Sequence, residues 1–322
     1  MHPQEVWHSR SVEARLLRTA LIPASFLYAC GWQTYLATYR LGLKHAAEPH
    51  CPVLCIGNLQ VGGSGKSPLS LYVAKRLRSL GFRVVMSLSG YGAPHSENAT
   101  LAPEGRLSPA EWGDEPAMVR WLAPDLPLVV GRNRVAAATA THTADPGAVL
   151  LMDDGFQHLP LQKHGTIVLD PPSPDNRWCL PAGPYREPRS NRSRADLVIP
   201  GRFQLEAKPT RFLDGAGAEQ SFGRYGLLCA LGNPESFASA VEKAAGRPAE
   251  AKRFLGDHDP MTEGTLLAQF LPDLDLIVSA KDWVKLRERP DAYSRRILIA
   301  SHEVFVTPQD EFDHWLKECL KR

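Results

Sequence analysis

The stretch Gly62-Gly63-Ser64-Gly65-Lys66-Ser67 is the strongest indication of the fold, because it lies between an apolar run at residues 53–56 and a helical pattern at about 68–80. Glycines let backbone N–H groups approach phosphate oxygens, a lysine reaches the β- and γ-phosphates, and a hydroxyl ligates Mg²⁺. The N-terminus of the following helix also favours anions. The sequence therefore predicts the phosphate loop of a P-loop NTPase-type domain that binds a nucleoside triphosphate, ATP or GTP, with Mg²⁺. The further motifs below favour ATP.

The loop has a variant form, because the general motif has a glycine where this chain has Gln60. Proline at position 68 suits the first turn of a helix, where its missing N–H is not needed. The predicted nucleotide-binding residues are Val61, Gly62, Gly63, Ser64, Gly65, Lys66, Ser67 and Pro68. Among these, we expect Lys66 to contact the β- and γ-phosphates and Ser67 to ligate Mg²⁺.

Short apolar runs alternate with helical patterns along the chain, which is typical of a parallel sheet in an α/β protein. Runs that resemble strands occur at 53–56, 84–88, 128–130, 148–152 and 167–169, and later at 227–230, 276–279 and 297–299. Helices are expected near 134–141, 235–245 and 262–270. The predicted division is an N-terminal helix at 1–45, a P-loop core at 46–205, a linker at 206–221 and a smaller α/β domain at 222–322.

Acidic side chains follow the apolar run at 148–152, where Asp153 and Asp154 stand side by side. A strand there would bring both carboxylates to the sheet edge that holds the phosphate loop, as in a Walker-B-type Mg²⁺ site. An isolated pair of this kind is more often a solvated turn or a helix cap. Because the pair follows a buried strand, we predict Asp153 and Asp154 as metal ligands.

Three further charged residues lie in short motifs with two interpretations each. Asp114 precedes a proline and an apolar stretch, so it suits a helix N-terminus as well as a catalytic base. His258 lies between two aspartates, which is typical of a polar turn but also of a pair that removes a hydroxyl proton. Arg186 lies in a proline-rich loop that suits holding a phosphate or stabilising the charge on the transferred group.

The N-terminal segment 19–39 contains no charged residue and has arginines or lysines on both sides. It could be a weak membrane span, a cleaved export signal, a helix packed on the domain or a helix at the membrane surface. Export would place an ATP-using domain where ATP is absent, and polar residues dilute a span. We favour the interfacial helix, with apolar contacts from Leu16, Leu17, Leu21, Phe26, Leu27, Trp32 and Tyr35.

Composition limits the class of protein. The chain has 322 residues, is 43% hydrophobic and carries a net charge of +2, which fits a globular protein and shows no general field for nucleic acid. Its six cysteines include no CxxC pair, so neither a zinc site nor a disulfide framework is expected.

Taken in order, the motifs resemble those of the tetraacyldisaccharide 4'-kinases, the lipid A 4'-kinase family. The motifs are Gly57-Asn58 through the loop to Pro68, Gly90-Tyr91-Gly92, Gly113-Asp114-Glu115-Pro116, Asp153-Asp154-Gly155-Phe156-Gln157-His158, Leu180-Pro181-Ala182-Gly183-Pro184-Tyr185-Arg186-Glu187-Pro188, Gly232-Asn233-Pro234, Asp257-His258 and Lys281-Asp282. They extend over nearly the whole chain. Two positions depart from the family pattern, Ser89 in place of an arginine and Asn133 in place of an aspartate.

The resemblance implies a kinase on the cytosolic face of the Gram-negative inner membrane that phosphorylates the 4'-hydroxyl of tetraacyldisaccharide 1-phosphate to form lipid IVA. It implies that Asp114 is the base paired with His258, that Arg186 neutralises phosphate charge, and that the N-terminal helix docks on the membrane. A monomer without nucleic-acid partners is expected. The alternatives are a P-loop kinase of a soluble metabolite and a nucleotide-binding regulatory module without transfer activity.

Overall fold

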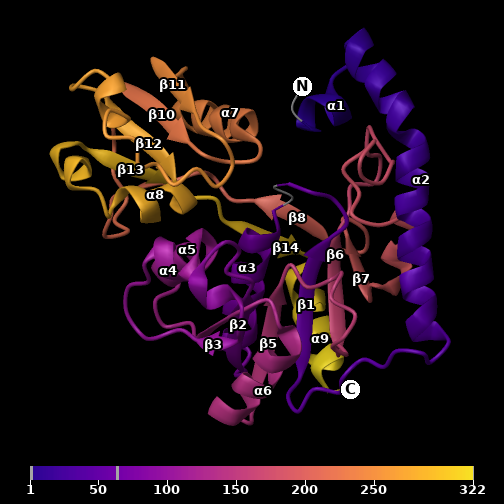
Figure 1. The fold of residues 1–322 in the computed structure, drawn as a ribbon. Helices are drawn as coiled ribbons and strands as arrows, with labels where there is room; N and C mark the ends of the chain where they lie inside the picture. The colour runs from indigo at the N-terminus through magenta and orange to yellow at the C-terminus, as the bar shows by residue number, and fades with distance from the viewer. Residues whose placement is uncertain (1–2, 63–64, 322) are drawn as a thin grey trace.

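The larger unit is a seven-stranded sheet in the computed structural model, which describes residues 3–62 and 65–321 (Figure 1). The strand order is β3-β4-β2-β5-β1-β6-β7, and every neighbouring pair is parallel except β3 with β4. The strands are β1 (Val53–Asn58), β2 (Arg83–Leu88), β3 (Thr100–Leu101), β4 (Leu128–Val130), β5 (Ala148–Asp153), β6 (Gly165–Leu169) and β7 (Leu197–Ile199). The predicted α/β class with a largely parallel sheet is confirmed.

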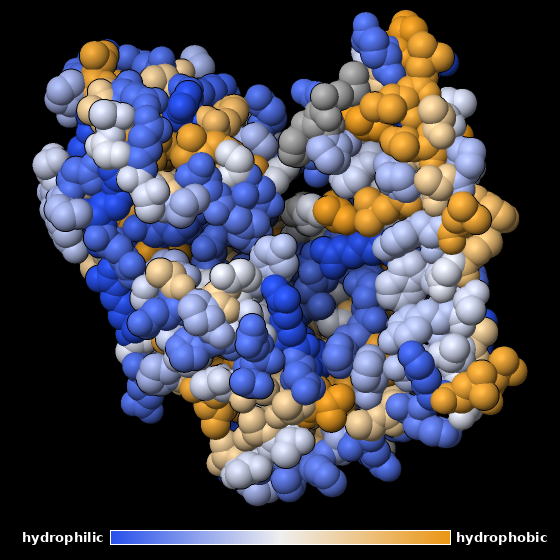
Figure 2. Space-filling view, in the orientation of Figure 1, coloured by the Kyte–Doolittle hydropathy of each residue, from blue (hydrophilic) through white to orange (hydrophobic). Residues whose placement is uncertain are grey.

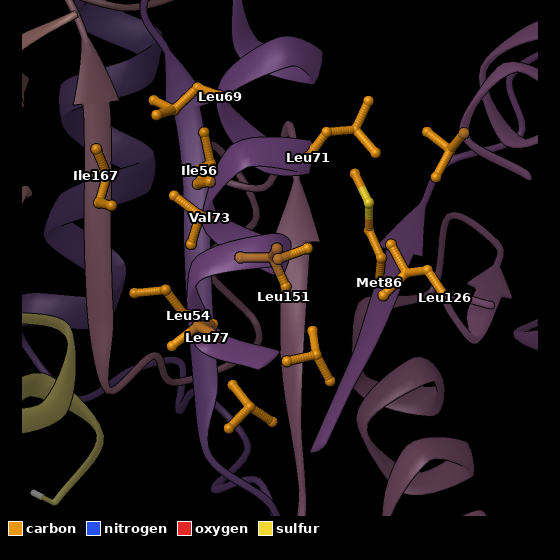
Figure 3. Close-up of a cluster of buried hydrophobic side chains, with 14 of the residues drawn as sticks. Leu54, Ile56, Leu69, Leu71, Val73, Leu77, Met86, Leu126, Leu151 and Ile167 are labelled. Atoms are coloured by element: carbon orange, nitrogen blue, oxygen red, sulfur yellow. The ribbon is translucent and has the colours of Figure 1, made fainter. Parts of the chain in front are cut away.

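Helices cover both faces of this sheet, because its central strands are apolar on both sides. Helices α3 (Lys66–Ser79) and α9 (Gln309–Leu320) pack on one face, and α6 (Arg134–Ala144) packs on the other. Leu54 and Ile56 of β1 and Leu151 of β5 are fully buried against α3 (Figure 3). Two shorter helices, α4 (Pro109–Trp112) and α5 (Asp114–Leu122), follow β3 in the chain.

The smaller unit is built on a five-stranded sheet with the order β11-β10-β12-β13-β9, parallel except at β9. Its strands are β9 (Phe212–Leu213), β10 (Tyr225–Cys229), β11 (Ala251–Phe254), β12 (Asp275–Ser279) and β13 (Ile297–Ala300). Helices α7 (Pro234–Ala245) and α8 (Ala280–Leu286) contribute to its buried clusters. Short 3₁₀ turns occur at Pro94–Ser96, Arg189–Arg194, Leu267–Gln269 and Pro290–Ser294.

The expected division of the chain differs from the structure at three places. Strand β9 lies inside the predicted linker but pairs with β13 of the smaller sheet. Strand β14 (Val304–Thr307) pairs antiparallel with β8 (Gln204–Ala207), and α9 packs on the larger sheet, since its apolar side chains complete that core. The helix expected at 262–270 is wrong, because only a short turn forms where Leu266, Leu267 and Phe270 are individually buried under the smaller sheet.

Helix α2 (Val12–Arg40) lies along the larger unit beside β7 and follows the short helix α1 (Pro3–His8) (Figure 1). Ser25, Ala29 and Leu36 of α2 point toward the protein at helical spacing. Of the seven expected lipid contacts, four are exposed and three are half-buried; the exposed ones are Leu16, Leu17, Phe26 and Leu27. Within residues 3–62 and 65–321, no helix combines the length and apolarity that a membrane crossing requires.

Replacing Phe312 by alanine is expected to lower the free energy of unfolding by about 3–5 kcal/mol, because a fully buried aromatic ring is removed from a packed core. The ring lies 5.3 Å from that of Phe203 and 6.3 Å from that of Tyr72. Denaturant unfolding measures the change, with His314→Ala on the exposed side of α9 as the control. Equal stability of the two variants would contradict the packing of α9 on the larger sheet.

Candidate active site

The ends of β1 and β5 bring the phosphate loop and the acidic pair together. The two strands are parallel neighbours in a register that places Ile56 beside Asp153. The chain leaves β1 into the loop that begins at Leu59 and leaves β5 at Asp154, which has a φ of 53°. Because both turns leave the same edge of the sheet, the Asp154 side chain lies next to the phosphate loop.

Helix α3 begins at Lys66, two residues earlier than the sequence pattern predicts. Gly65 precedes it with a φ of 81°, a left-handed conformation that glycine adopts without strain. The first N–H groups of α3 therefore point toward the loop. Gly63 and Ser64 are predicted nucleotide contacts that lie outside the described residues. The flanking Gly62 also has a left-handed φ, of 108°.

The loop that carries Arg186 runs beside the phosphate loop. The Val61 N–H donates to the Pro184 carbonyl at 2.8 Å, and the Arg186 N–H donates to the Leu59 carbonyl at 2.7 Å. Helix α2 holds the same loop from its other side, because the Tyr28 hydroxyl donates to the Arg186 carbonyl at 2.8 Å. The Arg186 backbone is thus fixed between the phosphate loop and α2.

Lys66, Asp154 and Arg186 form one charged group. Arg186 Nη1 donates to both Asp154 carboxylate oxygens at 3.0 and 2.9 Å, and Lys66 Nζ lies 3.7 Å from Asp154 Oδ1. Burial would raise the pKa of Asp154, but the charges of Lys66 and Arg186 outweigh it and hold the pKa below its usual value. Asp154 therefore stays ionised, and two cations stand where phosphate oxygens could bind.

Asp153 has a different environment from its neighbour. Its side chain is buried and accepts a hydrogen bond from Ser70 Oγ at 2.8 Å, while its carbonyl accepts one from Arg134 Nη2 at 2.9 Å. Burial is the main cause that raises the pKa of Asp153 to about 6, helped by the charges of Glu115 and Asp154. Of the two predicted metal ligands, Asp154 is the more accessible, with 32% of its side chain exposed.

Asp114 and His258 meet across the boundary between the two units. Asp114 is the first residue of α5, after Gly113 with a φ of 92°, and His258 lies in the turn after β11 with a φ of 63°. His258 Nδ1 is 3.3 Å from Asp114 Oδ2. Burial acts to raise the pKa of Asp114, but His258 and the charges of Lys285 and Lys281 lower it below its usual value. The structure thus joins two residues that are 144 positions apart.

Tyr91 connects the two groups. Its ring centroid lies 6.1 Å from that of His258 and 5.2 Å from the Arg132 guanidinium. Arg132 in turn lines a cavity of about 530 Å³ together with Asp154 and Arg186. The other lining residues are Tyr28, Trp32, Val61, Ser89, Arg134, Gln157, His158 and Leu180.

Several residues near the site were not predicted from the sequence. Arg132 and Lys285 were unassigned, because a single basic residue in a loop or helix has no pattern of its own. Trp32 was expected in lipid but lines the cavity, since helical spacing turns it toward the protein with Ser25 and Ala29. Ser89, where the resemblance predicts an arginine, lines the same cavity.

Known proteins match the chain over most of its length. The model of the family "Tetraacyldisaccharide-1-P 4'-kinase" matches residues 17–321. The tetraacyldisaccharide 4'-kinase of Aromatoleum aromaticum is 33% identical, covering 92% of each chain, and that of Dechloromonas aromatica is 36% identical, covering 82% of this chain and 83% of the relative.

A crystal structure of LpxK from Aquifex aeolicus in complex with ATP shares the fold, with a TM-score of 0.80 and 24% identity over 94% of this chain and 99% of that one. The fold agrees with the larger and smaller sheets described above. The family match and the curated relatives both extend through the phosphate loop, the acidic pair and the His258 turn. This chain belongs to the tetraacyldisaccharide-1-P 4'-kinase family.

Proposed function

We propose that this protein transfers the γ-phosphate of ATP to the 4'-hydroxyl of tetraacyldisaccharide 1-phosphate and forms lipid IVA. Family membership supports the acceptor. The observation that supports the chemistry most directly is the meeting of Asp114 and His258 at 3.3 Å, connected through Tyr91 and Arg132 to the cavity lined by Asp154 and Arg186. A nucleotide-binding module without transfer activity has no need for such a pair.

Each charged group has a role in this proposal. Lys66 and Arg186 bind the phosphates and neutralise the charge on the transferred group. Asp114 accepts the proton of the acceptor hydroxyl, and His258 orients the carboxylate. The hydroxyl oxygen then bonds to the γ-phosphorus as the bond to the ADP oxygen breaks.

Magnesium fits the acidic edge of the site. Asp154, Asp153 and the Ser67 hydroxyl would hold the ion, which offsets negative charge on the β- and γ-phosphates when bound. In the described part of the chain, no group of three or more His, Cys, Asp and Glu side chains could hold a metal by itself. A site with few protein ligands suits Mg²⁺, which keeps several waters and binds through substrate phosphates.

The direct test is to incubate the detergent-solubilised protein with Mg-ATP and tetraacyldisaccharide 1-phosphate and to analyse the lipid by mass. Addition of one phosphate, dependent on the acceptor, supports the proposal. ATP binding without acceptor-dependent release of ADP would instead support the regulatory module. Phosphorylation of a soluble sugar but not of the lipid would support the soluble-metabolite kinase.

Docking on the cytosolic face of the inner membrane is part of the proposal, and the outer side of α2 supports it. The side chains of Leu16, Phe26 and Leu27 are 64–72% exposed, and Figure 2 shows hydrophobic residues over α2. The opposite side of α2 reaches the site through Tyr28 and Trp32. An acylated substrate could therefore keep its chains in the lipid while its sugar enters the cavity. We propose that the protein acts as a monomer.

The double variant Phe26→Glu with Leu27→Glu is expected to weaken binding to anionic liposomes about tenfold or more, because two exposed apolar contacts with lipid are lost. Liposome sedimentation measures the change. The matched control is Leu271→Glu with Tyr293→Glu, which alters two exposed apolar residues of the smaller unit. Equal binding of both double variants would contradict docking through α2.

Surface substitutions are preferable to a deletion of residues 1–40. The deletion would also remove the Tyr28 hydrogen bond to the Arg186 carbonyl and the Ser25 bonds to the Cys179 carbonyl and the Ala182 N–H. A loss of activity could then come from a disturbed loop at 178–186 as well as from lost membrane binding. The substitutions leave these contacts in place, so transfer to detergent-dispersed substrate should persist.

A further inference from the structure

Lys285 is a buried lysine beside the candidate base. Its side chain, on α8 of the smaller unit, is 4% exposed. Its Nζ donates to the Asp259 carbonyl at 2.8 Å, lies 3.3 Å from Asp282 Oδ1, and lies 3.7 Å from Asp114 Oδ2. An ammonium group has three donors, and here three oxygens from three separate segments surround it.

The smaller unit supplies two of the three oxygens around this lysine, the Asp259 carbonyl and Asp282 Oδ1. Asp282 is fully buried and is itself held by Ser279 Oγ at 2.6 Å and by the Ala230 N–H at 3.2 Å. A buried ammonium requires such compensation, since an unpaired charge out of water is costly. Asp114 adds an ion-pair contact, with its Oδ2 3.7 Å from Nζ and so beyond hydrogen-bond distance, and it comes from the larger unit. The lysine therefore presents a positive charge across the boundary at a fixed place.

We propose that Lys285 is a positioning residue for phosphoryl transfer: its ammonium group reaches across the boundary between the two units and holds the Asp114 carboxylate anionic and oriented. The inference rests on the proposed function and adds a residue to it. In the transfer step, the acceptor hydroxyl proton passes to Asp114 while its oxygen bonds to the γ-phosphorus and ADP leaves. Lys285 touches neither substrate and takes no part in the proton transfer.

The electrostatic surroundings of Asp114 agree with this role. Burial pushes the pKa of Asp114 up, and the contact with His258 and the charges of Lys285 and Lys281 push it down further than burial raises it. Charged or titratable groups near it on α5, the His258 turn and α8 are Glu115, Asp257, His258, Asp259, Lys281, Asp282 and Lys285. Of the two lysines, Lys285 is the more deeply buried: its side chain is 4% exposed, and that of Lys281 is 13% exposed.

The sign of the expected pH effect follows from this arrangement. A base works only when ionised, so activity falls as the pH drops through its pKa. Without the Lys285 charge the pKa of Asp114 rises, and the acid limb of the profile of kcat/KM moves to higher pH. An opposite charge at this range typically shifts a carboxyl pKa by about 1–3 units, so a displacement of about one pH unit or more is expected.

The experiment measures kcat/KM against pH for the full chain with Mg-ATP and tetraacyldisaccharide 1-phosphate. Lys285→Met removes the charge at similar length, and Lys285→Arg keeps it and should restore the wild-type midpoint. Because Lys285→Met leaves Asp282 buried without its partner, a second variant, Lys285→Met with Asp282→Asn, removes both charges together. Lys243→Met, on the exposed side of α7, is the matched control. Denaturant unfolding confirms that each variant is folded.

The inference predicts that both Lys285→Met variants shift the acid limb upward, with the KM for ATP unchanged, whereas Lys243→Met does not. A uniform loss of activity with the wild-type profile shape, in the folded double variant, would show that Lys285 is only structural and would overturn the inference. Wild-type protein that adds no phosphate to the lipid would overturn the proposed function, and the inference with it. The wild-type assay therefore separates the two failures.

Discussion

Replacing Lys66 by alanine is expected to lower kcat by about 10³-fold or more. In phosphoryl-transfer enzymes, a cation that neutralises charge on the transferred phosphate raises kcat by about this factor. Lys66 is the first residue of α3, and its ammonium is 3.7 Å from Asp154 Oδ1, so it stands at the edge where the helix N-terminus faces the loop. Without it, Asp154 keeps Arg186 as a partner, and the fold should persist. Mass analysis of the lipid after incubation with Mg-ATP measures the loss.

The matched control for Lys66 is Lys75→Ala, on the exposed side of the same helix. It removes an equal charge from α3 without touching the phosphate loop and should leave kcat near the wild-type value. If Lys66→Ala retained wild-type turnover while the control behaved as expected, the assignment of this loop to ATP would be wrong. This result would not separate the lipid kinase from a soluble-metabolite kinase, because both hypotheses assign ATP to the same loop.

Replacing Asp114 by asparagine is expected to reduce kcat by about 10²–10⁴-fold, the usual contribution of a general base. Asparagine is nearly isosteric and can still cap α5, so the change tests the charge and not the packing. The KM for ATP should change little, because Asp114 faces His258 and Lys285 and not the phosphate loop. Single-turnover measurement of the transfer step checks this outcome.

Asp125→Asn, in the exposed loop after α5, is the control for loss of one carboxylate. Unchanged turnover in the Asp114 variant would rule out its role as the base. The combined variant of Asp114→Asn with His258→Ala tests whether the two act as a unit, in which case the combined loss is much smaller than the product of the single losses. Independent losses would argue against the pairing seen at 3.3 Å.

Local sequence predicted five of the seven strands of the larger sheet and the closeness of Lys66 and Asp154, but not β3 or β7. The runs at 53–56, 84–88 and 148–152 form β1, β2 and β5, because strands that are buried on both faces consist of continuous apolar residues. A glycine-rich loop followed by a helix has one common use, and a strand that ends in two aspartates points its carboxylates to the same edge. Lys66 and Asp154 were therefore predictable as neighbours.

Other features depend on contacts between segments that are far apart in the chain. The return of α9 to the larger sheet could not be predicted, because an amphipathic helix shows that it has a buried face but not which sheet covers that face. The helix expected at 262–270 failed for a similar reason, since individual burial of its apolar residues outweighed their helical spacing.

The sequence by itself determined the parallel sheet and, through its ordered motifs, the family, and it predicted the phosphate loop. Short stretches carry these features, and their local geometry is nearly independent of the rest of the chain. The resemblance predicted that Asp114 pairs with His258, whereas only the tertiary structure decided that Lys285 lies beside Asp114 and that α2 holds the Arg186 loop. Charges act through space over a few ångströms. Which charges come that close is decided by how the two units and the N-terminal helix pack together.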